Sequence, residues 1–418
     1  MPRKVELPKE GFEPKDPGLW EKKDLWKTIV REYRLVTPLF GGGVEPYKAN
    51  HVTLIRASEI KGHLRFWWRA LFGWKASGSL KTLLALEEAV WGGVFTDKKR
   101  ASQVQLTVKT LSKGKEAFPL YYTTNRQGKK VVRFRPEIAH PYLSFSLQQK
   151  EEDSRTGKKR EILHSLIQGV VFQLRITYPR AVSEDVETAL WAWETFGGIG
   201  ARTRRGFGAV VPEGFKPPSE QGIREKLRDL LKGDGWPEGV PHLRPDSLFY
   251  LYPGSWRDLA EAYKNFRQWR NGARGRSKWP EPDEIRRITR KNSPGHEPRH
   301  PVNKFPRGQF GLPIIFHFKD KDKGDPPDTT LKGQAYERLA SPLGFKPYGE
   351  KGPVLVYVLE GNRKLPEPYI LDTPMGPKPV SVEPTPEEAS SIEPLKAVGG
   401  ETDPLRAFIE WLKQGGRK

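Results

Sequence analysis

The stretch TALWAWETFGGIGARTRRGFGAVV, residues 188–211, supports the first structural and functional hypotheses for this chain. Apolar residues at helical spacing precede residues 197–208, and the apolar run 209–211 after them is typical of a strand. Residues 197–208, the glycine-arginine loop, hold five glycines, three arginines and no acid. Glycine allows sharp turns and close approach, and backbone N–H groups with guanidinium forks suit phosphate oxygens. The loop is therefore predicted to bind a phosphate chain, with a flexible surface turn as the alternative.

The candidate RNA-binding positions in this loop are Gly200, Arg202, Thr203, Arg204, Arg205 and Gly206. The helix before it is predicted to begin near Ser183 and to end at Gly197, with Val186, Ala189, Leu190 and Trp193 facing the core. Strands are predicted over 29–35, 104–108, 143–147, 170–177 and 209–211, and apolar residues alternate with polar ones in the second, third and fourth of them. A second helix is predicted over 58–72, with Ser58 as its N-cap. This order fits a ferredoxin-like, RRM-like sheet backed by two helices.

The length of 418 residues favours two domains. The predicted divisions are 1–215, a linker with a short helix over 216–246, and 247–418. Strands are predicted over 248–252, 312–318 and 354–359, and helices over 220–231, over 256–269 and after Thr402. Residues 1–20 are predicted as a loose arm, 148–160 as an exposed hairpin tip and 361–400 as extended. The predicted fold class is α+β, with two ferredoxin-like domains and long insertions, the second lacking a terminal strand.

Charge composition favours a polyanionic partner. The chain has 72 Lys and Arg against 51 Asp and Glu, a net charge of +21. Nucleic acid is the first candidate partner and a membrane surface the second. The absence of cysteine excludes disulfides, thiolate metal sites and cysteine nucleophiles. With no long apolar stretch and a charged N-terminus, we expect a cytoplasmic protein; two methionines and proline-rich loops suit a thermophile.

The helix over 58–72 carries a candidate RNA-binding stripe. Lys61, Arg65 and Arg69 follow each other at intervals of four, and Arg56 precedes them. Trp68 and Phe72 flank the stripe. Cations beside aromatic rings suit single-stranded nucleic acid, because phosphates meet the cations and bases stack on the rings. The alternative is a solvated helix face with both rings in the core.

A second basic cluster spans residues 264–307, with 13 Lys and Arg against four acids. It is predicted to touch a polyanion or, as the alternative, to be a disordered solubilising loop that could become ordered on binding. Its candidate RNA-binding residues are Arg270, Arg274, Arg276, Lys278, Arg286, Arg287, Arg290, Lys304 and Arg307.

The sequence gives little support for catalysis, metals or cofactors. His296 and His300 have helical metal-ligand spacing, but Pro294 and Pro298 exclude the helix. A metal-independent ribonuclease needs a positioned base, acid and cation, and nothing distinguishes His51, His63 or His140 for such a role. His63 is interpreted as a packed structural residue.

Several blocks together resemble the RAMP superfamily of CRISPR proteins. They are Thr37-Pro38-Leu39-Phe40-Gly41-Gly42, residues 55–71 (IRASEIKGHLRFWWRAL) and the glycine-arginine loop. The helix motif with paired tryptophans is most similar to the family of the first RAMP subunit of type III-B (Cmr) effector complexes. Residues 309–313 (QFGLP) and 338–343 (RLASPL) also resemble that family. His63 departs from the motif, which usually has a small residue there.

The resemblance implies two ferredoxin-like domains in a non-catalytic subunit of an RNA-guided, RNA-targeting complex. It implies contact with single-stranded guide RNA, target RNA or both near the 3′ region of the guide, beside other RAMP subunits and without a membrane. Two alternatives stay open. One is a metal-independent RAMP endoribonuclease that processes guide RNA, and the other is a scaffold whose basic surface docks acidic protein neighbours.

Overall fold

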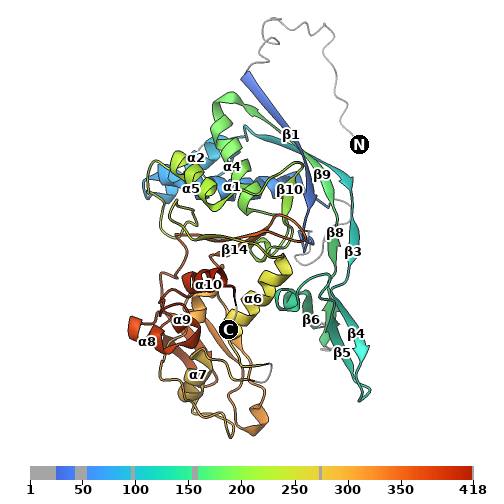
Figure 1. The fold of residues 1–418 in the computed structure, drawn as a ribbon. Coiled ribbons are helices and arrows are strands. Elements are labelled where there is room, and N and C mark those ends of the chain that lie inside the picture. The colour runs from blue at the N-terminus through green and yellow to red at the C-terminus, as the bar shows by residue number, and fades with distance from the viewer. Residues whose placement is uncertain (1–24, 43–53, 96–98, 153–158, 273–274, 417–418) are drawn as a thin grey trace, which may run out of the picture.

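The computed structural model describes residues 25–42, 54–95, 99–152, 159–272 and 275–416. The predicted N-terminal arm, His51, Arg274 and the end of the predicted hairpin lie outside these ranges. The described part is an α+β fold with several antiparallel sheets, as predicted. Figure 1 shows one group of elements around β1, a second group around α7, and strand β14 between them.

The N-terminal sheet has the ferredoxin-like strand order β10-β1-β9-β2, with every neighbouring pair antiparallel. Its strands are β1 (Trp26–Leu35), β2 (Gln105–Ser112), β9 (Val171–Pro179) and β10 (Val210–Pro212). Helix α1 (Ala57–Phe72) follows β1, and α4 (Ser183–Phe196) follows β9. Without its insertions the chain therefore runs β-α-β-β-α-β, which confirms the predicted fold of this part.

Burial follows the predicted faces of these elements. Phe172, Leu174 and Ile176 of β9 are buried, and so are the predicted core residues of α4. On α1 the buried residues include Ile60, Leu64, Trp67 and Leu71. Removing each large apolar side chain from water stabilises the fold by about 1.5–3 kcal/mol. The two helices therefore cover one face of the sheet because their apolar stripes require it.

Two local predictions are wrong. Ser58 is not the N-cap of α1, because Arg56 takes that position and makes no side-chain cap. Residues 143–147 are not a strand but form α3 (Pro141–Ser144) and a 3-10 turn over Phe145–Leu147. Pro141 fits the first helical position, and His140 caps the turn by accepting the Tyr142 N–H at 3.2 Å.

An insertion of hairpins lies between β2 and β9. They pair as β3 (Lys115–Ala117) with β8 (Leu166–Gln168), β4 (Leu120–Thr124) with β5 (Lys130–Phe134), and β6 (Gln148–Glu152) with β7 (Lys159–Leu163). The β4–β5 hairpin projects from the side of the molecule in Figure 1. The β6–β7 pair confirms the hairpin predicted over 148–160.

The C-terminal part contains a second ferredoxin-like unit without a fourth strand among the described residues. Its sheet has the order β11-β15-β14, built from β11 (Phe249–Tyr252), β14 (Leu343–Pro347) and β15 (Val354–Val358). Helices α6 (Trp256–Gln268) and α10 (Pro404–Lys413) take the two helix positions in chain order. Beside β11, the Leu251 N–H donates to the Glu220 carboxylate at 2.9 Å, so this backbone group is satisfied without a neighbouring strand.

A small antiparallel sheet and several helices complete the C-terminal part. The sheet order is β12-β13-β16-β17, from β12 (Ile314–Phe316), β13 (Thr329–Gly333), β16 (Tyr369–Thr373) and β17 (Gly376–Val380). The further helices of the described chain include α2 (Leu80–Trp91), α5 (Glu220–Leu230), α7 (Glu281–Thr289), α8 (Pro386–Ser391) and α9 (Glu393–Lys396). The prediction that 361–400 is extended is therefore wrong, because two paired strands and two helices form there.

The two ferredoxin-like units share core contacts. Phe196, at the end of α4, packs against Phe249 at 6.0 Å and Tyr357 at 5.3 Å between ring centroids. The Tyr348 and Tyr357 hydroxyls donate to the carbonyls of Thr195 and Phe196. Because apolar clusters cross them, the predicted domain boundaries remain predictions.

Lys346 of β14 is buried at this junction. Its Nζ donates to the carbonyls of Gly197 and Val210, each at 2.7 Å. Gly197 caps the C-terminus of α4, where a helix dipole favours a cation. Burial nevertheless lowers the pKa of Lys346 to about 7, with Glu194 acting in the opposite direction.

Replacing Lys346 by Met should flatten the pH dependence of stability. Between pH values of about 7 and 10.5 the unfolded lysine binds more protons than the folded one, so the free energy of unfolding rises with pH. The wild-type slope should exceed that of K346M by up to about 1.4 kcal/mol per pH unit. Urea unfolding at several pH values measures the slope, and K81M, at an exposed lysine, should keep it. Parallel curves for wild type and K346M would contradict this role.

Candidate nucleic-acid interface

The glycine-arginine loop folds tightly between the two ferredoxin-like units. Gly200, Arg202, Gly206 and Gly208 have positive φ angles of 79°, 59°, 80° and 60°. A Cβ on Gly208 would lie 1.9 Å from the Ile199 carbonyl oxygen, and one on Gly206 would lie 2.5 Å from Trp256 Nε1. Glycine is therefore required here by close protein packing as well as by backbone conformation.

Protein groups accept hydrogen bonds from two glycine N–H groups of this loop. The Gly200 N–H donates to Glu59 Oε1 at 2.6 Å, and the Gly206 N–H donates to the Thr203 carbonyl at 2.9 Å. Burial raises the pKa of Glu59, although this hydrogen bond and Arg56 favour its ionised form. A carboxylate of the chain itself thus lies where an anion was expected.

Two of the loop arginines hold the C-terminal unit. Arg204 Nη1 donates to the Ser341 carbonyl at 2.6 Å, and Arg205 Nη1 donates to the Leu343 carbonyl at 2.8 Å. The Arg204 guanidinium also lies over the Phe66 ring at 5.7 Å. The structure therefore gives Arg204 a docking contact, and its predicted contact with RNA stays a prediction.

Two arginines of the basic stripe of α1 share one carboxylate. Arg65 Nε and Arg69 Nη1 both reach Glu87 Oε1 of α2, at 2.5 and 2.7 Å. Trp68 and Phe72 are buried at 2% and 1% exposure, which supports the alternative that both rings lie in the core. Burial, followed by Arg65, lowers the pKa of Lys61, and Arg56 donates to the Gly42 carbonyl.

Two of the three histidines considered as bases are held by protein packing. Burial lowers the pKa of His63 to about 4, so this ring is neutral near pH 7, in agreement with a packed role. The Nδ1 of His140 accepts the Tyr142 N–H, which places the proton on Nε2, 2.9 Å from Glu261. His51 lies outside the described residues.

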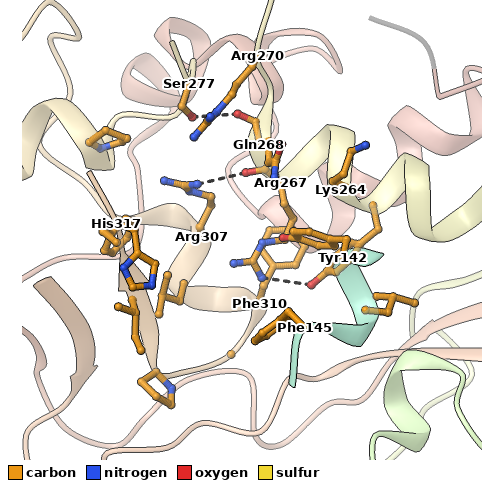
Figure 2. Close-up of a pocket in the computed structure, with 18 of the residues that line it drawn as sticks. Tyr142, Phe145, Lys264, Arg267, Gln268, Arg270, Ser277, Arg307, Phe310 and His317 are labelled. Carbon is orange, nitrogen blue, oxygen red and sulfur yellow. Dashed lines mark hydrogen bonds between the residues drawn. The ribbon is translucent and has the colours of Figure 1, made fainter. Parts of the chain in front are cut away.

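The described residues form a cleft of about 1840 Å³, which we call the basic cleft. It lies between the hairpin insertion, the glycine-arginine loop, α6 and β12. Ten lysines and arginines line it against four carboxylates. These cations are Arg202, Arg205, Lys264, Arg267, Arg270, Arg276, Arg286, Arg307, Lys319 and Arg338. Figure 2 shows Arg270, Arg307 and His317 around one open space, with Tyr142, Phe145 and Phe310 nearby.

Six of the predicted RNA-binding residues line this cleft. They are Arg202, Arg205, Arg270, Arg276, Arg286 and Arg307. Arg276 is paired with Asp283 at 2.7 Å, and Arg286 with Asp325 at 3.0 Å, so their charges are partly neutralised.

Other predicted residues of the 264–307 cluster do not line the basic cleft. Lys278 pairs with Glu393 at 2.6 Å, Arg287 pairs with Glu284, and Lys304 lies 4.0 Å from Glu388. Arg290 is an exposed residue that ends α7 with a φ of 53°. The structure thus divides the predicted cluster between the cleft and surfaces outside it.

The sequence alone did not identify Arg267 or the aromatic residues of the basic cleft as candidate binding residues. Phe145 is 61% exposed and lies 5.2 Å beneath the Arg202 guanidinium. Tyr142 and Tyr263 contact each other at 5.8 Å, and Arg267 Nη1 donates to the Tyr263 hydroxyl at 3.2 Å. The i, i+4 spacing of Tyr263 and Arg267 in a predicted helix was the one available signal.

The arginines of the cleft act on the pKa of the Tyr263 phenol. Burial alone would raise the pKa of this phenol, but Arg205, Arg267 and Arg202 together lower it below its usual value. A lowered pKa at a buried phenol means that nearby positive charge exceeds negative charge.

His296, Asp320 and Asp325 also come together in the cleft, with their ligand atoms within 4.8 Å of one another. Asp325 already accepts hydrogen bonds from Arg286 Nε and Nη2, and this cation opposes a metal ion there. We therefore assign no metal to this group. Among the described residues, no helix is both long and apolar enough to cross a bilayer.

Comparison with known proteins confirms the resemblance to the RAMP superfamily, whose model matches residues 32–211. CRISPR system Cmr subunit Cmr1-1 of Pyrococcus furiosus is 27% identical over 157 residues, covering 37% of this chain and 40% of that protein. Subunit Cmr1-2 of the same organism is 26% identical over 188 residues, covering 43% of this chain and 92% of that protein. The match thus spans less than half of the first relative and nearly all of the second.

Solved structures of the same kind are similar to this chain. The crystal structure of apo Cmr1 from Pyrococcus furiosus aligns with a TM-score of 0.41 and 19% identity, over 80% of this chain and 88% of that one. A chain of the type III-B Cmr-beta complex bound to cognate target RNA aligns with a TM-score of 0.44 and 16% identity, over 80% and 95%.

Replacing Arg204 by Ala should weaken the docking of the two units. The Ser341 carbonyl would lose its charged donor, at a cost of about 1–3 kcal/mol in the free energy of unfolding. Urea unfolding provides the measurement. Arg34→Ala, at an exposed position on β1, should change stability by less than about 0.5 kcal/mol. Equal stability of the two variants would show that the Arg204 contact contributes nothing to docking.

Proposed function

We propose that this protein is a non-catalytic RNA-binding subunit of a type III-B Cmr effector complex in the cytoplasm. It holds single-stranded guide RNA, target RNA or both, near the 3′ region of the guide, beside other RAMP subunits. The relation to two Cmr1 subunits supports membership of such a complex. The observation that carries RNA binding is the basic cleft, where ten cations face four carboxylates next to exposed and half-buried rings.

The cleft suits single-stranded RNA for two physical reasons. Its cations attract phosphates irrespective of sequence, and its rings offer flat surfaces to unstacked bases. The proposal therefore moves the main RNA path from the α1 stripe to the cleft, since Arg65 and Arg69 are held by Glu87. Recognition is largely independent of sequence, as expected where base pairing selects the target.

The endoribonuclease alternative has one candidate residue in the cleft. His317 is 69% exposed there, and its Nδ1 lies 3.0 Å from Asp328. A denaturing gel of RNA incubated with the protein in EDTA tests this alternative. Intact RNA agrees with a binding subunit, whereas a product that disappears in H317A would establish cleavage.

Removing cleft cations should weaken RNA binding across sequences. For the double variant R270A/R338A, we expect the slope of log affinity against log salt to fall by about 0.7 per lost phosphate contact. A gel-shift with single-stranded RNA at several salt concentrations gives the slope. R34A/R175A removes two exposed arginines from the open face of the N-terminal sheet and is the matched control. An equal fall of the slope in both variants would mean that RNA binding depends on the total charge of the protein and not on the basic cleft.

Replacing Phe145 by Ala should remove one stacking surface. The loss is expected to be about 1–3 kcal/mol of binding free energy for single-stranded RNA, and F145W should retain binding. Fluorescence anisotropy with labelled oligouridylate measures the affinity. Phe95 is 69% exposed and does not line the cleft, so F95A serves as the control. Unchanged affinity of a folded F145A would remove the ring from the RNA path.

A further inference from the structure

Two arginines in the basic cleft are fixed against each other and against aromatic rings. Arg267 lies on α6, and Arg307 lies on a 3-10 turn over Pro306–Phe310. Arg307 Nη1 donates to the Arg267 carbonyl at 3.2 Å, as Figure 2 shows. The Arg267 guanidinium lies over Phe310 at 4.9 Å, and that of Arg307 over Phe316 at 5.4 Å. Their conformations are thus set by packing before any ligand binds.

These guanidiniums carry more donors than the protein satisfies. Arg267 Nε and Arg307 Nε and Nη2 are buried and have no hydrogen-bond acceptor. Arg307 Nε lies 3.0 Å from Glu281 Oε2, so an ion pair exists, but its geometry makes no hydrogen bond. Buried charged donors are costly when unsatisfied, and an anion that accepts hydrogen bonds from this arginine pair would offset that cost.

The local charge is also unbalanced. Arg205 lies over the Tyr263 ring at 5.2 Å, and Arg267 lies over the same ring at 5.8 Å. Glu281, which is fully buried, is the acid that pairs with Arg307. Three guanidiniums therefore converge, Glu281 pairs with one of them, and the lowered pKa of Tyr263 agrees with a surplus of positive charge.

We propose that Arg267 and Arg307 form a phosphate-binding subsite on the wall of the basic cleft, which takes one backbone phosphate of single-stranded RNA. The assignment to RNA rests on the proposed function, whereas the phosphate chemistry rests on the arginine pair. Planar guanidinium forks match the tetrahedral oxygens of phosphate and remain charged at all relevant pH values. Arg205 adds a third charge, and Phe145 offers a stacking surface elsewhere in the same cleft.

The first test measures phosphate without RNA. Thermal unfolding of the full chain is followed in inorganic phosphate and in chloride at equal ionic strength. Wild type and R257Q should gain thermal stability from phosphate, because Arg257 is exposed on α6 and does not line the cleft. R307Q should lose this gain. An equal gain in R307Q and R257Q would overturn the subsite.

The second test uses hexauridylate and the same variants. R307Q should bind about tenfold more weakly than R257Q, as expected for a lost charged hydrogen bond. One neutral methylphosphonate linkage, moved along the oligonucleotide, should cost affinity at one position in wild type and little there in R307Q. Equal affinities and equal methylphosphonate profiles of R307Q and R257Q would overturn the proposal.

Two further outcomes separate the subsite from the proposed function. If R307Q fails to fold, R307K replaces it, because lysine keeps the charge beside Glu281 but lacks the planar fork. R307K should gain less thermal stability from phosphate than wild type does. An equal gain in R307K and wild type overturns the subsite. If phosphate stabilises wild type but hexauridylate does not bind at low salt, the RNA assignment is overturned. Tight RNA binding without any phosphate effect overturns the subsite and leaves the proposed function standing.

Discussion

The position of the basic cleft depends on hydrogen bonds from the glycine-arginine loop to the first residue of β14 and to Ser341, two residues before it. Arg204 and Arg205 donate to the carbonyls of Ser341 and Leu343, while Lys346 of β14 donates back to Gly197 and Val210. Charged donors make stronger bonds than neutral ones, and here they join two units that each present backbone oxygens. The cleft exists because this junction fixes α6 opposite the hairpin insertion.

Helices and strands such as α1, α4 and β9 could be predicted from the sequence because their burial patterns are local. The alternation on β9 and the stripes on α1 and α4 each depend on a few consecutive turns or residues. The wrong strand prediction over 143–147 also rested on a local pattern. Leu143 and Leu147 are buried in a strand-like pattern, but Pro141 and the His140 cap favour a helical turn, and local periodicity alone does not separate the two.

The functional site was only partly predictable, since a guanidinium binds any correctly placed oxygen. The composition of the glycine-arginine loop suits phosphate and backbone carbonyls equally, and the choice depends on β14, more than 130 residues away. Likewise, Glu87 pairs with both Arg65 and Arg69 through a contact between two helices that no spacing rule predicts. The cluster over 264–307 was found by charge density, but its division between cleft and outer surface needed the tertiary structure.

The cations of this chain differ in whether a carboxylate compensates their charge. Arg65, Arg69, Arg276 and Arg286 have carboxylate partners, so their fields fall off quickly beyond the pair. Arg267 instead faces a tyrosine hydroxyl and aromatic rings, which hold it without cancelling its charge. At Arg307 burial lowers the pKa, so holding this charge costs stability in the free protein. An anion that binds there offsets this cost. Because it binds the folded chain, it raises the free energy of unfolding.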